Sequence, residues 1–373
     1  MEKIRGVNLG NWLVLEKWMH RKLFEGIDAQ DETDFCSGLP EAEKLARLKV
    51  HRDTFITYED IRSIKAYGMN LVRVPVPHFI FGDDPGWCEP YVGCIEYLDQ
   101  LFEWCKELKI GILIDLHTVP GSQNGFDNGG LCGICEWHTK PENVERALSV
   151  LEMLAKRYQT HPALYGIQLL NEPVEESMLA STLKKYPARD LERAKHSEAV
   201  PTDLLREFYT DGYFRLRRYL DEDRAIVFHD GFRLKEWAGF MQGPEYKNII
   251  LDTHIYDSMN GPAKREPMPY SYYTRLLEEH SKELVYMRQF FPVIVGEWSL
   301  MHFVPDKETF SDLETKLSYR IMADLQLHTW ERYSDGWIFW SYKVIHPDNQ
   351  TNPGWSLKDC IRRDWFPCEW SGL

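Results

Sequence analysis

Residues 95–116 read IEYLDQLFEWCKELKIGILIDL, and this stretch decides the fold. Its first part, 95–108, places apolar residues such as Leu98 and Leu101 at helical spacing with charged residues on the other face, which predicts an amphipathic helix. The closing residues 111–116 form a short apolar run, typical of a strand that is covered on both faces. A helix that leads directly into a buried strand is part of a repeating βα unit, the unit of a parallel sheet.

The same unit recurs along the whole chain. Short apolar runs predict eight strands, at residues 4–9, 70–75, 111–116, 164–170, 225–229, 249–254, 293–297 and 336–340. Amphipathic stretches predict outer helices at 58–67, 95–108, 141–158, 202–220, 271–290 and 311–333, with a short one near 234–241. Eight βα units in succession predict an α/β protein with a (β/α)₈ TIM barrel.

No linker or low-complexity segment interrupts this alternation, so we expect a single domain over residues 1–373. The main interruption is a charged insertion at about 175–201, which follows the fourth strand and precedes its helix. In a barrel this position lies on the active-site face. A solvated surface loop and a role in substrate binding or oligomer contact fit the insertion equally well.

The composition argues against two classes of partner. Lys and Arg number 44 against 58 Asp and Glu, a formal charge of −14, which repels nucleic acid and anionic lipid surfaces. No apolar run approaches the roughly 20 residues of a membrane-spanning helix. The 13 Trp and 19 Tyr residues suit flat apolar faces that stack on sugar rings, although packing could use many of them.

The first residues carry no signal-peptide pattern, which favours a cytoplasmic protein; a chain trimmed of such a peptide would read the same and be secreted. The eight cysteines are expected to be reduced thiols. Cys132 and Cys135 have a spacing that can bind zinc, but no second pair or histidine cluster completes four ligands. We expect no metal and no cofactor, and the oligomeric state stays open.

Two glutamates end predicted strands and carry the chemistry. Glu172 follows the fourth strand in Asn171-Glu172-Pro173, and Glu297 ends the seventh before Trp298. Glycoside hydrolysis needs one protonated carboxyl as acid and one ionised carboxyl, and a separation of about 5–5.5 Å gives retention whereas a wider one gives inversion. The sequence leaves that distance open. We expect a raised pKa for Glu172 from burial and the neighbouring negative charge.

Longer motifs make the chain similar to glycoside hydrolase family 5, and to its exo-β-1,3-glucanase branch. The opening Gly6-Val7-Asn8-Leu9-Gly10-Asn11-Trp12-Leu13-Val14-Leu15-Glu16 resembles that branch's first strand and loop. Asp115-Leu116-His117 and the run from Pro120 to Asn128 resemble its third. The resemblance covers nearly the whole chain, and it thins over 341–349, after Trp340.

The resemblance implies a retaining mechanism with Glu172 as acid/base and Glu297 as nucleophile. It also implies supporting roles: Arg73 holds Glu297 ionised, Asn171 donates to the sugar 2-hydroxyl, and His254 and Tyr256 bond the carboxylates. Glu16, His117 and Asn128 would contact sugar hydroxyls, and Trp340 would form the platform beneath the sugar. Trp298 is a candidate for a subsite wall because it directly follows Glu297. His138, His161, His229, His302 and His346 are expected to be ordinary surface or hydrogen-bonded histidines.

The sequence thus predicts a cofactor-free retaining β-glycosidase, exo-acting on β-1,3-glucan or short β-gluco-oligosaccharides. Three alternatives stay open: a relative acting on another β-glycoside, such as a β-1,6-glucan or a glycoconjugate; a transglycosylase, which intercepts the same covalent intermediate with a sugar hydroxyl; and a catalytically silent sugar-binding barrel. In each case the partner is a β-linked oligo- or polysaccharide.

Overall fold

The chain folds as a closed barrel of eight parallel strands in sequence order. The structure, a computed structural model, describes residues 2–259, 261–345 and 352–367. The strands are β1 (Ile4–Asn8), β2 (Leu71–Val76), β3 (Gly111–Leu116), β4 (Leu164–Gln168), β5 (Ala225–His229), β6 (Ile249–His254), β7 (Val293–Glu297) and β8 (Gly336–Phe339). Pairing of β1 with both β2 and β8 closes the barrel, and the predicted TIM barrel is confirmed.

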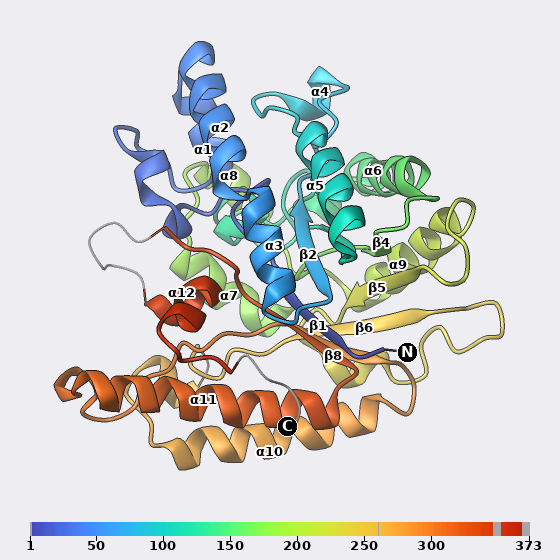
Figure 1. Cartoon of the computed structure of the whole chain (residues 1–373). Helices are drawn as coiled ribbons and strands as arrows, with labels where there is room; N and C mark the ends of the chain where they lie inside the picture. The colour runs from blue at the N-terminus through green and yellow to red at the C-terminus, as the bar shows by residue number, and fades with distance from the viewer. Residues whose placement is uncertain (1, 260, 346–351, 368–373) are drawn as a thin grey trace.

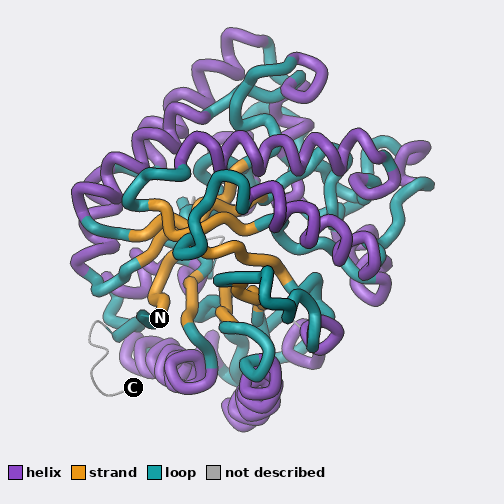
Figure 2. Tube along the Cα trace, turned by 90° about the vertical axis from the view of Figure 1, so that its right-hand side faces the viewer, coloured by secondary structure: helices purple, strands orange, loops and turns teal. Residues whose placement is uncertain are grey.

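Helices surround this barrel, as the view in Figure 2 shows, with the strands gathered at the centre. The helices that follow the strands are α5 (Ile95–Leu108), α6 (Pro141–Tyr158), α9 (Thr202–Leu216), α10 (Tyr270–Met287) and α11 (Asp312–Tyr333), and α1 (Glu32–Gly38), α2 (Glu41–Phe55) and α3 (Tyr58–Ala66) lie between β1 and β2. Short helices are α4 (Pro85–Cys88) and α12 (Leu357–Arg362). After β5 the predicted short helix is one 3₁₀ turn, η5 (Leu234–Trp237).

The helix boundaries follow local sequence signals. Thr57 and Asp60 form a capping box at the start of α3, and Ser311 and Glu314 form another at the start of α11, so each pair satisfies free N–H groups of a first turn. The 175–201 insertion contains two helices, α7 (Glu176–Lys185) and α8 (Leu191–Ala194). About half of the insertion is therefore helical.

The barrel interior has two layers of opposite character. The lower layer is an apolar cluster of inward-facing side chains: Ile4, Leu71, Leu113, Ala225, Val227, Ile250, Ile294 and Ile338. Two residues further along the strands, the same face becomes polar, as on β6, where Asp252 and His254 follow Ile250 at alternate positions. Gly296 makes room there, since a Cβ on it would lie 2.1 Å from the Asp252 carboxylate.

Three sequence expectations concern features away from the catalytic strands. Within the described ranges no helix is long and apolar enough to cross a membrane. The seven cysteines in those ranges are free and buried, and neither Cys132 nor Cys135 belongs to a group of three metal-ligating side chains there. Cys368 and His346 lie outside the described residues.

Candidate active site

A cavity of about 1000 Å³ lies at the carboxyl ends of the strands. Loops after β1, β3, β5 and β6 line it, together with helix α7 of the insertion. Seven of the residues named from the sequence line this cavity: Glu16, Asn128, Glu172, His254, Tyr256, Glu297 and Trp340. The insertion contributes Met178, Thr182 and Lys185, so it forms part of the cavity wall.

Arg73 fixes Glu297 from beneath the cavity. Its guanidinium is fully buried and donates to Glu297 Oε1 at 2.9 Å, and it also lies 3.0 Å from Asp115. Gln168 and Asn171 accept two further bonds from the same side chain, each at 2.8 Å. A buried charge is tolerated only when its donors are paired in this way. The other carboxylate oxygen, Glu297 Oε2, accepts from the Tyr256 hydroxyl at 2.9 Å.

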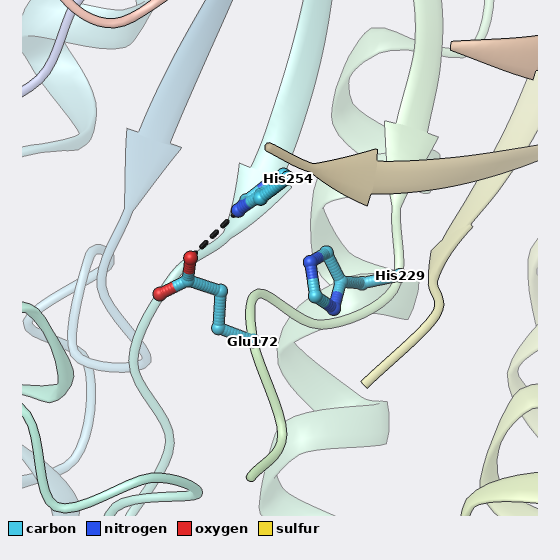
Figure 3. Close-up of side chains that lie close together, drawn as sticks. All are labelled: Glu172, His229 and His254. Carbon is cyan, nitrogen blue, oxygen red and sulfur yellow. Dashed lines mark hydrogen bonds and ion pairs between the residues drawn. The ribbon is translucent and has the colours of Figure 1, made fainter. Parts of the chain in front are cut away.

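Glu172 has hydrogen-bond partners different from those of Glu297. His254 Nδ1 lies 2.7 Å from Glu172 Oε1, the contact drawn in Figure 3, and Asn128 Nδ2 donates to Oε2 at 3.0 Å. The backbone of Glu172 is left-handed, with φ +42°, which is unfavourable for a side chain of this size. Backbone strain of this kind is typical of functional sites.

The two carboxyl groups lie close together. The single atom His254 Nδ1 is 2.7 Å from Glu172 Oε1 and 3.5 Å from Glu297 Oε2. Those two oxygens are therefore at most about 6 Å apart, a bound that includes the roughly 5–5.5 Å separation of the carboxyls in retaining glycosidases. Such closeness is compatible with direct attack by Glu297 and retention of configuration.

An aromatic wall lines the cavity where β8 meets β1. Trp340 belongs to one cluster with Trp18, Tyr256 and Trp355. The Trp340 ring stacks on His117 with centroids 5.7 Å apart, and a side chain at Gly10 would collide with it, since a Cβ there would lie 2.8 Å from the indole. The glycine in the first motif thus makes room for the platform. Flat aromatic faces of this kind suit sugar rings.

Comparison with known proteins decides the family. A sequence profile described as cellulase (glycosyl hydrolase family 5) matches residues 36–344, most of the chain. The chain belongs to glycosyl hydrolase family 5. A probable glucan 1,3-β-glucosidase A from Emericella nidulans is 31% identical to this family 5 enzyme, over 98% of this chain and 90% of that protein. A glucan 1,3-β-glucosidase from Yarrowia lipolytica is 30% identical, over 98% and 89%.

Solved structures agree on the fold. Rutinosidase from Aspergillus niger superposes with a TM-score of 0.76 at 21% identity and covers 98% of each chain. Endoglucanase Cel5A from Thermotoga maritima superposes with a TM-score of 0.54 at 16% identity, over 97% of this chain and 94% of that one. The family membership makes this protein a glycoside hydrolase.

The family 5 site places its proton differently from the sequence expectation. Burial alone raises the pKa of Glu172, but the hydrogen bond and charge of His254 lower that pKa to about 2. Burial opposes the charge on His254, yet Glu297, Asp252 and Glu172 raise its pKa well above the ordinary value. The pKa of Glu297 is raised by burial and by Glu172, against His254 and Arg73. The predicted raised pKa of Glu172 is therefore wrong, because the hydrogen bond and charge of His254 outweigh burial.

Two residues differ from their predicted contacts. Trp298 is fully buried between Trp330, Trp337 and Phe339 and is not among the cavity-lining residues, so its predicted role as a subsite wall is wrong. Asn171 is also fully buried, accepts from Arg73, and has its Nδ2 only 3.4 Å from His117 Nε2.

Sequence reasoning missed Asp252, which links His254 to Gln168 and to the backbone of β7. Its carboxylate accepts from Gln168 Nε2 at 2.8 Å and from Gly296 N at 2.8 Å, and it lies 3.2 Å from His254 Nε2. The missed signal was an acidic residue inside an otherwise apolar strand, two positions before His254 and hence on the same face. Asp252 thus holds His254 charged and oriented.

Within the described ranges, one group of three side chains has the spacing to hold a metal ion. Glu172, His229 and His254 lie close together, as Figure 3 shows, and all three are buried. However, His229 Nδ1 accepts from Gly231 N at 2.9 Å, which leaves the ring proton of a neutral His229 on Nε2. His254 directs both ring nitrogens at carboxylates. Neither ring offers a lone pair, so the group is better suited to holding a proton than an ion.

Proposed function

We propose that this enzyme releases glucose from the non-reducing end of β-1,3-linked glucan or short β-gluco-oligosaccharides, by double displacement. Glu297 attacks the anomeric carbon and Glu172 serves as acid and then as base. The observation that carries the proposal is the pair of buried carboxyls held within about 6 Å by one histidine nitrogen. The glucan 1,3-β-glucosidase names of the relatives support the linkage.

The proton must reach the leaving oxygen through Glu172. In the free site it lies on His254, joined to Glu172 by the 2.7 Å contact. When a sugar enters, it shields the carboxyls from water, and transfer along this bond returns the proton to Glu172 before the glycosidic bond breaks. Attack by Glu297 then neutralises that carboxylate and lowers the pKa of Glu172, which favours its later role as base.

Polar groups beside the aromatic wall supply contacts for the terminal sugar. Glu16 accepts from Trp18 Nε1 through Oε2 at 2.8 Å, whereas its buried Oε1 has no hydrogen-bond partner among the described residues. An unpaired acceptor of this kind lining a catalytic cavity suits a sugar hydroxyl. Asp127, with its pKa raised by burial, lines the same cavity and accepts from Tyr186 of the insertion.

Early-time product analysis tests the proposal. The enzyme is incubated with laminari-oligosaccharides and with β-1,4- and β-1,6-linked counterparts, and the first products are separated by chromatography. Glucose as the sole early product from the β-1,3 series supports an exo-β-1,3-glucosidase, and NMR of the first glucose should show the β-anomer. Preference for another linkage would overturn the substrate, and early α-glucose would overturn the mechanism.

A further inference from the structure

The cavity continues past Glu172 to the side opposite the aromatic wall. Because the strands follow one another around the barrel, the loops after β4 and β5, which carry Glu172 and Phe232, face those after β8 and β1. If the terminal sugar stacks on Trp340, the group that leaves must lie beyond the acid Glu172, over these loops. This step rests on the proposed function.

The side chains on this wall are largely apolar. Met178 of α7, Phe232 and Leu234 of the loop after β5, Met259 after β6 and Leu284 of α10 all line the cavity. The first four are half-buried, so they keep surface toward the opening. An apolar surface inside a cavity contributes affinity only when an apolar ligand covers it.

The charged groups of this wall are mostly bonded to one another. Lys235 pairs with Glu283 at 2.8 Å, and Asp257 lies 2.8 Å from His280 Nε2. Arg233 donates to Gly231 O, Val200 O and Thr202 Oγ1, and only its buried Nη2 has no acceptor within the described ranges. These particular charged groups are therefore engaged mainly with protein partners and leave few donors and acceptors for a second sugar.

Phe232 differs from the other apolar residues of this wall in its backbone conformation. Its backbone has φ +62°, a left-handed conformation that a bulky side chain rarely adopts. Asp230 holds the loop in place, since it accepts from Phe232 N and from the Thr253 hydroxyl, each at 2.8 Å. Strain kept in place by such bonds, at a cavity wall, indicates a functional residue.

We propose that this wall is a binding site for an apolar leaving group, such as an alkyl or aryl aglycone, with Phe232 at its centre. The substrates so favoured are β-glucosides of apolar alcohols, rather than longer glucans alone. Apolar contact is worth about fourfold in affinity for each methylene fully removed from water.

Calorimetric titration with methyl, butyl, hexyl and octyl β-D-thioglucosides, below micelle-forming concentration, tests this site without turnover. We expect Kd to fall along the series, with octyl at least 30-fold tighter than methyl, and an increasingly negative heat-capacity change. Equal Kd values, or tighter binding of a thio-linked β-1,3-disaccharide than of the octyl compound, would overturn the proposal.

Variants assign the effect to the wall. Phe232→Gly removes the ring and relaxes the left-handed backbone, so it should fold. We expect the ratio of the methyl Kd to the octyl Kd to be at least tenfold smaller in this variant than in the unsubstituted enzyme. Leu234→Asn, which leaves Phe232 intact, should reduce this Kd ratio by a smaller factor. The matched control Leu313→Asn, at an exposed position of α11, should leave this Kd ratio unchanged. An undiminished preference in both wall variants would overturn the site.

Hydrolysis of phenyl β-D-glucoside by the same preparation separates the two proposals. Absent hydrolysis would contradict the proposed function, whereas the thioglucoside titrations would still report on the apolar wall. Turnover of phenyl glucoside together with a flat titration series would leave the glycosidase in place and remove the apolar site.

Discussion

The lower and upper layers of the barrel interior use the same strand faces for opposite purposes. Below, Ile250 and Ile294 belong to an apolar cluster in which each side chain needs only the right volume. Above, Arg73, Asp252 and His254 form a network in which each charge depends on its partners. The difference teaches that one layer holds the barrel together while the other positions two carboxyls, so substitutions in the two layers should affect different measurements.

Removing the nucleophile should produce the largest effect. Glu297→Ala leaves no carboxylate to attack the anomeric carbon, and we expect kcat to fall by roughly 10⁵-fold on every β-glucoside, whatever its leaving group. Initial rates on aryl glucosides and oligosaccharides measure this, with circular dichroism as a check on folding. A loss confined to poor leaving groups would contradict the assignment.

Removing the acid/base should give a loss that depends on the leaving group. Glu172→Ala should lower kcat/KM by about 10²- to 10⁴-fold on an oligosaccharide, since the leaving alkoxide needs a proton. On a dinitrophenyl glucoside, which leaves without one, we expect less than a tenfold loss. Equal losses on both substrates would remove Glu172 from this role.

Arg73 connects activity with stability in the upper layer. Arg73→Met leaves Asp115 and Glu297 buried without their cation, so the free energy of unfolding should fall by about 3–5 kcal/mol in urea titrations. Because Arg73 lowers the pKa of Glu297, that pKa should rise in the variant. The acidic limb of kcat/KM then moves to higher pH, and an unmoved limb would speak against the coupling.

A lower-layer substitution should separate the two quantities. Ile250→Ala leaves a cavity in the apolar cluster, and we expect the free energy of unfolding to fall by about 2–4 kcal/mol. Because Ile250 touches no reacting atom, kcat should stay within about twofold at a temperature where the variant is folded. A loss of activity as large as that of Arg73→Met would show that the layers are not independent.

The smallest expected effect is a displaced pH limb. The pKa of His254 is raised, so the proton held by the pair His254 and Glu172 is present below that pKa and lost as pH rises through it. The basic limb of kcat/KM should lie above the ordinary histidine value. In His254→Asn the proton must lie on the Glu172 carboxyl, so we expect the limb to move to lower pH. If the basic limb of kcat/KM lies at the same pH in both enzymes, the proton that controls it is not shared between His254 and Glu172.

The ends of the strands were predictable because their signal is local. Glu172 and Glu297 follow apolar runs, and a barrel brings the ends of all strands to one face. The same logic shows why Trp298 was misassigned: adjacent strand residues point to opposite faces, so a tryptophan directly after the inward-facing Glu297 points outward, toward Trp330. The alternation was present in the sequence and should have decided that residue.

Other features depend on residues far apart in the chain. His254 lies 82 positions from Glu172, and only the closed barrel puts its ring 2.7 Å from that carboxylate and beside Asp252. The sequence cannot state such distances, yet they determine which group holds the proton.

By itself, the sequence determined the eight βα units and the two glutamates at strand ends, because hydrophobic period and strand ends are properties of neighbouring residues, whereas the roles of Arg73 and Trp340 came from the family resemblance. Only the tertiary structure decided the short separation of the carboxyls, the charge on His254 and the apolar wall around Phe232. These depend on Coulomb interactions and burial, which act through space between strands and become defined only when the barrel closes.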